Sequence, residues 1–263
     1  MGTSGRPGPV ATQRGIRMFK RRFRETHQLA ALFFAAVLLC AGAPPAGSAG
    51  GPAATPAAQR SAFTIGRLKY GGGGDWYGDQ GSLRNLLAGL RDRAGVPVGV
   101  DDAPVVSPTD EALFNYPMVF MSGHGNVKFT PAEVERLRRY LTGGGFLWCD
   151  DDYGIDSSFR REMKRVLPDA DLVELPFGHP VFHQLYQFPR GLPKIHEHDG
   201  GAARAFGAFH DGRMVVFYTF DTDIGDGMED AGVHPDSPEK REEAMKMGIN
   251  VALYCMSDGA MTP

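Results

Sequence analysis

Apolar positions along this chain form two kinds of pattern, which are short runs and stripes spaced three or four residues apart. The runs predict strands at 63–68, 96–100, 117–122, 146–150, 172–175, 205–210 and 213–220. The stripes predict helices that begin near Ser82, Thr130, Asp156 and Ser237. Strands that alternate with helices in this way are typical of an α/β domain, with a mainly parallel sheet and helices on both faces.

Local signals mark several of the expected element ends. Thr130-Pro131-Ala132-Glu133 has the form of a capping box with proline at the first helical position. Ser82 is expected to cap the first helix, and Pro97 places the 96–100 strand at an edge of the sheet, because proline cannot donate to a neighbouring strand. Asp211-Gly212, between two strand runs, predicts a C-terminal β-hairpin.

The stretch from Leu141 to Gly154 is predicted to deliver a site at the centre of the sheet. A helix ends at three consecutive glycines, and a run too apolar for a surface strand follows. Three carboxylates, Asp150, Asp151 and Asp152, come where that strand should end. Ligands of open α/β sheets bind outside the carboxyl ends of the strands, so these carboxylates are candidate site residues.

Two other loops are expected at the same edge of the sheet. Gly123-His124-Gly125 follows a neighbouring strand and would bring an open imidazole near the carboxylates, although a loop histidine that only bonds backbone is the alternative. The loop after the first strand carries four glycines, including Gly73, followed by Asp75 and Trp76. Its glycine spacing fits no nucleotide-binding fingerprint, so we interpret it as a flexible loop with aromatic residues at the sheet edge.

Three further stretches carry histidines or carboxylates, and the first and the last of them have spacings close to those of metal sites. His179 and His183 would share one face if Pro180 starts a helix. His196-Glu197-His198-Asp199 lies in a long predicted loop, and such loops are often functional, with a solvated polar loop as the alternative. The stretch 221–227 has Asp residues spaced nearly as in a calcium loop, but its third Asp is displaced by one and no Glu closes it.

The N-terminal residues have the layout of an export signal. Basic residues between Arg14 and Arg24 precede an almost wholly apolar run at 29–42, and small residues follow. We expect a cleaved signal and a periplasmic or extracellular domain, since the apolar run is shorter than the ~20 residues of a membrane span. A retained membrane anchor is the alternative. The predicted organisation is signal peptide 1–49, linker 50–61, α/β domain 62–258 and tail 259–263.

Charge narrows the choice of partners. The chain has 263 residues, of which 42% are apolar and 22% charged, as in ordinary globular proteins. Residues 1–49 hold seven of the 28 Lys and Arg residues but one of the 31 Asp and Glu residues, so the remainder has 21 and 30 and a net charge of −9. Such an acidic domain lacks the basic surface that binds phosphate backbones, which argues against nucleic acid as a partner.

Several of these motifs together resemble a known family. They are Arg67-Leu68-Lys69-Tyr70, Tyr116-Pro117, Gly123-His124-Gly125, Gly143-Gly144-Gly145-Phe146-Leu147, Asp151-Asp152, His179-Pro180 and Met247-Gly248-Ile249-Asn250. The set, which spans about 63–257, resembles the bacterial domain-of-unknown-function family 4159, which is similar in fold to the class I glutamine amidotransferase superfamily. The resemblance implies a flavodoxin-like sheet and an exported or envelope setting, and it implies no particular reaction.

Cys149 is close to the position of the amidotransferase nucleophile, which lies on the sharp turn after the equivalent strand. A bulky Trp148 precedes it, and three carboxylates follow that would raise the pKa of the thiol and suppress its thiolate. Cys149 is therefore not expected to act as a nucleophile. Cys149 and Cys255 each lie inside an apolar run, so we predict buried thiols, with a disulfide between them after export as the alternative.

These observations favour a binding domain over an enzyme. We expect a small polar ligand, such as a carbohydrate or cell-wall fragment, held by Gly73, Asp75, Trp76, His124, Asp151, Asp152 and His179. A metal-dependent hydrolase is the first alternative, with a divalent ion on Asp151, Asp152 and His124. A non-catalytic component of an envelope complex is the second. Membrane contact is expected only through the N-terminal segment, if it is uncleaved.

Overall fold

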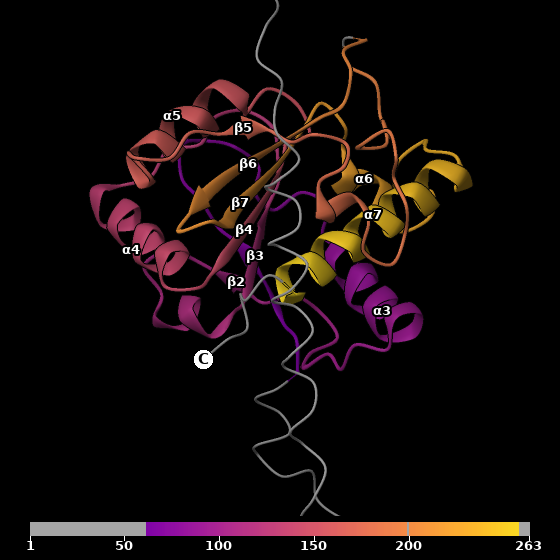
Figure 1. Ribbon diagram of the computed structural model, residues 1–263, viewed down its shortest axis with the longest axis horizontal. Helices are drawn as coiled ribbons and strands as arrows, with labels where there is room; N and C mark the ends of the chain where they lie inside the picture. The colour runs from indigo at the N-terminus through magenta and orange to yellow at the C-terminus, as the bar shows by residue number, and fades with distance from the viewer. Residues whose placement is uncertain (1–61, 199, 258–263) are drawn as a thin grey trace, which may run out of the picture. The chain divides into compact units, whose positions relative to one another are not determined.

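The computed structural model describes residues 62–198 and 200–257, in which helices lie against both faces of a seven-stranded sheet (Figure 1). The strands are β1 (Ile65–Leu68), β2 (Val105–Val106), β3 (Met118–Met121), β4 (Phe146–Asp150), β5 (Val173–Glu174), β6 (Arg204–His210) and β7 (Arg213–Phe220). The helices are α3 (Ser82–Ala94), α4 (Pro131–Thr142), α5 (Asp156–Val166), α6 (Ile224–Met228) and α7 (Pro238–Ser257), with 3₁₀ helices η1 (Glu111–Asn115) and η2 (Pro180–Phe182). The predicted signal peptide 1–49, linker 50–61 and tail 259–263 lie outside the described residues.

The sheet is parallel through five strands and antiparallel at one edge. Its order is β2-β1-β3-β4-β7-β6-β5, with parallel pairing from β2 to β7 and antiparallel pairing of β6 and β5. All five residues of β4 are buried, as expected for a strand covered on both faces. The structure thus confirms the predicted mixed α/β fold with a mainly parallel sheet. Asp211-Gly212 joins β6 to β7, and both residues have positive φ angles, 49° and 80°.

Two separate apolar cores fill the space between the sheet and its helices. Leu86 of α3 and Met247 of α7 belong to one core, and Leu137 of α4 belongs to the other (Figure 1). Successive side chains of a strand point to opposite faces, so Trp148 enters the α3/α7 core and Cys149 the α4/α5 core. The same alternation decides on which face each carboxylate at the end of β4 lies.

The predicted strand at 96–100 is wrong. This segment makes a single bridge, between Phe63 and Val98, and Pro97 accepts a hydrogen bond from the Phe63 N–H at 2.8 Å. The edge of the sheet is instead β2, which pairs with β1. Proline and glycine within 96–100 weaken regular pairing, which explains why a later apolar pair takes the edge position.

Ser82 does not cap α3 as predicted. The capping position is Gly81, and the Glu229 carboxylate accepts hydrogen bonds from the Gly81 and Ser82 N–H groups at 2.6 and 3.2 Å. A carboxylate at a helix N-terminus satisfies unpaired N–H groups and opposes the positive end of the helix dipole. The cap therefore comes from a segment 147 residues away in the sequence rather than from a local serine.

Two other local predictions are confirmed. Thr130 and Glu133 form the reciprocal capping box of α4, with the Thr130 N–H donating to Glu133 Oε2 at 2.7 Å. Cys149 and Cys255 are both buried, and no disulfide joins them. Their thiols therefore contribute to packing, in agreement with the prediction from their apolar surroundings.

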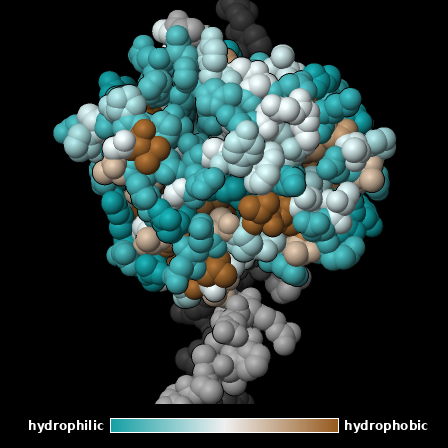
Figure 2. All heavy atoms as spheres, turned by 180° about the vertical axis from the view of Figure 1, so that it is seen from behind, coloured by the Kyte–Doolittle hydropathy of each residue, from teal (hydrophilic) through white to brown (hydrophobic). Residues whose placement is uncertain are grey.

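The surface is mostly polar on the face drawn in Figure 2, where apolar residues appear as small separate patches. Such scattered apolar residues are usual for a domain surface and mark no docking face by themselves. Among the described helices, none has both the length and the apolar composition that crossing a membrane requires.

Candidate functional site

The carboxyl ends of the strands carry an acidic site that forms around β4 and β7. Asp150 and Asp152 continue the alternation of Trp148 on the α3/α7 side of the sheet, where Asp150 bonds Gly225 and Asp152 lies near Asp79 and Asp223. Asp151 bonds Tyr218 on the other side. Asp150 accepts hydrogen bonds from the Gly225 N–H at 2.6 Å and from the Thr219 hydroxyl. The end of β4 is thereby tied to the segment that follows β7.

Five aspartates make up what we call the acidic cluster, namely Asp79, Asp150, Asp152, Asp223 and Asp226. Asp79 comes from the loop between β1 and α3, and Asp223 and Asp226 come from the start of α6. Gly225 shows how tightly the carboxylates converge, because a Cβ atom there would lie 2.7 Å from Asp79 Oδ2 and 3.3 Å from Asp150 Oδ2. Residue 225 must therefore be a glycine for these two carboxylates to approach one another.

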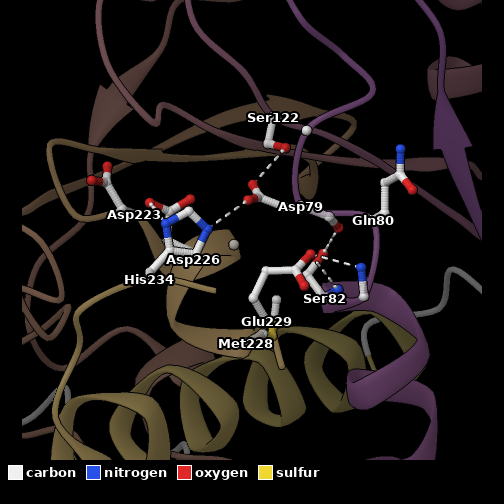
Figure 3. Close-up of polar contacts among 12 residues, drawn as sticks. Asp79, Gln80, Ser82, Ser122, Asp223, Asp226, Met228, Glu229 and His234 are labelled. Atoms are coloured by element: carbon white, nitrogen blue, oxygen red, sulfur yellow. Dashed lines mark hydrogen bonds and ion pairs between the residues drawn. The ribbon is translucent and has the colours of Figure 1, made fainter. Parts of the chain in front are cut away.

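Three imidazoles face the acidic cluster from its more exposed side. His234 lies between two carboxylates, with Nδ1 3.3 Å from Asp226 Oδ2 and Nε2 3.7 Å from Asp79 Oδ1 (Figure 3). His198 Nε2 is 2.6 Å from Asp223 Oδ2. The side chains of His234, His198 and His196 are 28%, 23% and 31% exposed, so a solute reaches the cluster past these rings.

The loop that carries Asp79 is held by two buried charged residues. The Arg67 guanidinium donates to the carbonyls of Gly78 at 3.0 Å and Asp79 at 2.9 Å. Glu229 holds the end of the same loop through the first N–H groups of α3, as Figure 3 shows for Ser82. Asp79 itself has a φ of 47° and accepts a hydrogen bond from the Ser122 hydroxyl at 3.3 Å. The position of Asp79 is therefore determined by contacts with β1, β3 and the α6 region.

Burial and mutual repulsion disfavour the charged forms of the clustered carboxyls. Burial, with added repulsion from Asp150 and Asp226, raises the pKa of Asp223 to about 9. Burial, with added repulsion from nearby carboxylates, raises the pKa of Asp79 to about 8 and that of Asp150 to about 7, although hydrogen bonds from Thr219 and Gly225 lower the latter. Burial also raises the pKa of Asp152 well above its usual range. Without a positive partner, the acidic cluster retains protons at neutral pH.

Within residues 62–198 and 200–257, no Lys or Arg side chain forms an ion pair with any of the five aspartates. The buried Arg67 donates to backbone carbonyls, and Lys194 pairs with Asp221 at 2.5 Å. Asp152 Oδ1 and Asp223 Oδ1 are buried and lack a hydrogen-bond partner. Unpaired buried carboxylate oxygens are costly, so the cluster is suited to a cation that is not part of the chain.

Two groups of ligand atoms in the cluster have the spacing that a metal ion needs. One consists of Asp79, Asp226 and His234, and the other of His196, Asp223 and Asp226. The atoms of each group lie within 4.8 Å of one another. Metal–ligand bonds of about 2.0–2.4 Å place the ligands of one ion at such separations. These residues therefore fit a divalent cation, and the mixture of imidazole and carboxylate suits zinc or manganese.

Of the predicted carboxylate pair, only Asp152 reaches the acidic cluster. Asp151 Oδ1 accepts from the Ile155 N–H at 3.1 Å at the start of α5, and its Oδ2 accepts from the Tyr218 hydroxyl at 3.0 Å. Burial raises the pKa of Asp151 to about 6, while these two hydrogen bonds lower it. Asp151 thus contacts the start of α5 and Tyr218, on the opposite side of the sheet from Asp152.

His124 lies at the rim of the site. The backbone N–H of His124 donates to the Asp75 carboxylate, and the ring atom Nδ1 is 3.2 Å from Asp75 Oδ2. The ring is 6.5 Å from the ring of His198, which also stacks on Tyr153 at 4.6 Å. His124 and Asp75 therefore border the acidic cluster without belonging to either group of metal-spaced atoms.

The remaining residues that were predicted to bind the ligand, Gly73, Trp76 and His179, lie outside the acidic cluster. Trp76 is partly buried against the α4/α5 core, with Lys69 Nζ 5.4 Å from its ring, and Gly73 has a φ of 95° in the same loop. His179 contacts the ring of Tyr254 at 5.4 Å, and Tyr254 contacts Phe146 at the opposite end of β4 from Asp150. The structure therefore does not bring His179 together with His124 and the carboxylates.

Sequence reasoning identified some members of this site and missed others. From the sequence, the loop at 196–199 is a candidate functional loop and the acidic stretch 221–227 is similar to a calcium loop, but neither is assigned to the site. The alternation along β4 was a signal that Asp150 and Asp152 share a face. Asp79 and His234 carry no local signal, because they reach the site only through the folding of long connections.

The comparison with known families covers the whole of this site. The model for the domain of unknown function DUF4159 matches residues 64–256. That range includes every residue of the acidic cluster and all three imidazoles. No curated protein matches the chain.

Proposed function

The chain belongs to the DUF4159 family, and we propose that it binds a divalent cation at the acidic cluster and, through that cation, a small polar ligand. One observation carries the proposal: five aspartates converge with largely buried side chains and without an ion pair to Lys or Arg among the described residues. Such a group either holds protons or holds a metal ion. Binding of a cation would release those protons and stabilise the fold.

The position of the acidic cluster in the sheet supports ligand binding. The five parallel strands have the order β2-β1-β3-β4-β7. This order is similar to that of a flavodoxin-like sheet, in which the strand order reverses between β1 and β3. Asp79 follows β1 and Ser122 follows β3, so the site borders this reversal. Ligands of such sheets bind at that place, and we therefore propose a flavodoxin-like or amidotransferase-like arrangement for the parallel part.

The rim of the site has the chemistry expected for a hydroxyl-rich ligand. Tyr153 is 49% exposed and stacks on His198, and His124 and Asp75 lie beside them. Aromatic faces beside carboxylates and imidazoles are suited to sugars. We propose a carbohydrate or cell-wall fragment as the ligand, bound by a domain that is exported through its N-terminal segment.

A hydrolase is the second candidate, favoured by the pairing of His198 with Asp223 at 2.6 Å. Burial and the neighbouring His196 and His124 lower the pKa of His198, which favours the neutral imidazole that can accept a proton from water. A bound cation would supply Lewis-acid polarisation of the substrate. Asp223 would keep the imidazole in one orientation.

The cation is tested by removing metals with EDTA and measuring the melting temperature after adding Ca²⁺, Mg²⁺, Mn²⁺ or Zn²⁺. We expect Mn²⁺ or Zn²⁺ to raise it in the unaltered protein and in the exposed-carboxylate control Asp169→Asn, but not in Asp226→Asn. Unchanged melting with all four ions, together with no metal in the purified protein, would refute the proposal.

Ligand binding and hydrolysis are separated by two further measurements. Calorimetry with N-acetylglucosamine oligomers should show heat of binding with the cation present and none in EDTA. Release of p-nitrophenol from p-nitrophenyl acetate should depend on the cation and fall in His198→Gln if the domain is a hydrolase. No release in the cation-loaded protein, with oligomer binding retained, supports the binding domain.

A further inference from the structure

We infer that the acidic cluster holds two divalent cations and that Asp226 bridges them. The inference rests on the proposed cation binding and adds the number of ions and the residue that joins them. Asp226 belongs to both groups of metal-spaced atoms, the first with Asp79 and His234 and the second with His196 and Asp223. A carboxylate has two oxygens and can therefore serve one ion with each.

The ligand atoms of these three aspartates and two histidines form two groups of three, which share Asp226, rather than one group of five. Within each group, the ligand atoms lie within 4.8 Å of one another. One ion would thus leave part of the set beyond bonding distance. The first group approaches from the loop between β1 and α3 and from the segment before α7, and the second from the loop before β6 and the start of α6. Asp226, at the start of α6, lies where the two approaches meet. Two-ion sites in proteins commonly separate their ions by about 3.5–4 Å, a span that one carboxylate bridges.

Unpartnered oxygens point to a ligand at the second group in particular. Asp223 is completely buried, and its Oδ1 has no hydrogen-bond partner although its Oδ2 faces His198. His196 Nδ1 lies 3.6 Å from Asp236 Oδ1, and Asp236 Oδ2 is again buried without a partner. A carboxylate beside a metal-binding imidazole orients the ring, which is the role expected of Asp236.

Charge balance also favours two ions over one. The five aspartates of the acidic cluster carry five negative charges when ionised. One divalent ion would leave three of these charges uncompensated in a buried site, whereas two would leave one. Asp150 and Asp152 belong to neither metal-spaced group, so they would contribute negative charge near the ions without coordinating them. Asp150 is held there by the Gly225 N–H and the Thr219 hydroxyl.

The number of ions is measured by loading EDTA-treated protein with Mn²⁺, removing unbound metal and determining manganese per chain by mass spectrometry. We expect two ions in the unaltered protein and in His210→Gln, a control at the end of β6 beside the hairpin turn. We expect one ion in His234→Gln, one in His196→Gln and a loss of both tightly bound ions in Asp226→Asn. Near-UV circular dichroism shows whether each variant is folded.

Electron paramagnetic resonance of the unaltered protein tests the bridge without any variant. Two Mn²⁺ ions joined by a carboxylate give a spin-coupled spectrum, whereas separate ions give the six-line signal of isolated Mn²⁺. One ion per chain would overturn the inference and leave the proposed cation binding intact. No bound ion would refute both. Two ions with an uncoupled spectrum would overturn the bridging role of Asp226.

Discussion

Replacing Asp223 by Asn should stabilise the metal-free protein, and the gain should grow with pH. Asp223 is completely buried, and its pKa is raised from 3.8 to about 9, chiefly by burial. The folded state therefore keeps a proton that the unfolded state releases above pH 3.8. Since the folded state binds more protons, the contribution of Asp223 to stability becomes less favourable as pH rises from about 4 to about 9. Asn resembles the protonated carboxyl and does not titrate.

The magnitude follows from the same pKa difference. Each pKa unit corresponds to about 1.4 kcal/mol. The proton on Asp223 therefore lowers the free energy of unfolding by about 4 kcal/mol at pH 7 and by less than about 1 kcal/mol at pH 4. The amide still offers an oxygen to His198, and any packing cost of the substitution is the same at both pH values. The difference between the two stability changes is therefore about 3–4 kcal/mol.

The assay is urea denaturation in EDTA at pH 4, 5, 6, 7 and 8, comparing the unaltered protein, Asp223→Asn and the exposed control Asp169→Asn. We expect the free energy of unfolding of Asp223→Asn to exceed that of the unaltered protein increasingly towards pH 8, and the control to show no such trend. With Mn²⁺ present the order should reverse, because the variant loses a ligand. A pH-independent difference between Asp223→Asn and the unaltered protein in EDTA would refute the reasoning, since it would mean that Asp223 is ionised in the fold.

Two further substitutions test the assignment of roles. Glu229→Gln should lower the free energy of unfolding by about 1–2 kcal/mol, because it weakens the hydrogen bonds that cap α3, and urea denaturation at pH 7 measures this. A change below about 0.5 kcal/mol would show that the cap is not important for stability. Asp151→Asn should leave the manganese content unchanged and alter stability by less than about 1 kcal/mol, because the amide can still accept from Ile155 and donate to the Tyr218 oxygen. Loss of bound manganese in this variant would contradict its placement across the sheet from the acidic cluster.

Local sequence signals were sufficient where an element depends on its own residues. The capping box of α4 forms as predicted because Thr130 and Glu133 satisfy each other's backbone groups within one turn. β4 could be predicted from its apolar run because a strand buried on both faces needs no polar side chain until it ends. The Ser82 prediction was wrong because a residue far along the chain, Glu229, occupies the position that a local cap would take.

The same division applies to the site. The sequence by itself determined the α/β fold class, the strand that carries Asp150 to Asp152 and the edge of the sheet where a site would form. Only the tertiary structure decided which carboxylates meet, because alternation along β4 sends Asp151 to one face and its neighbours to the other. Asp79 and His234 are 155 positions apart in the numbering, yet their side chains lie 3.7 Å apart. Such a contact is set by how long connections fold over the sheet, and no short-range pattern of polar and apolar residues encodes it.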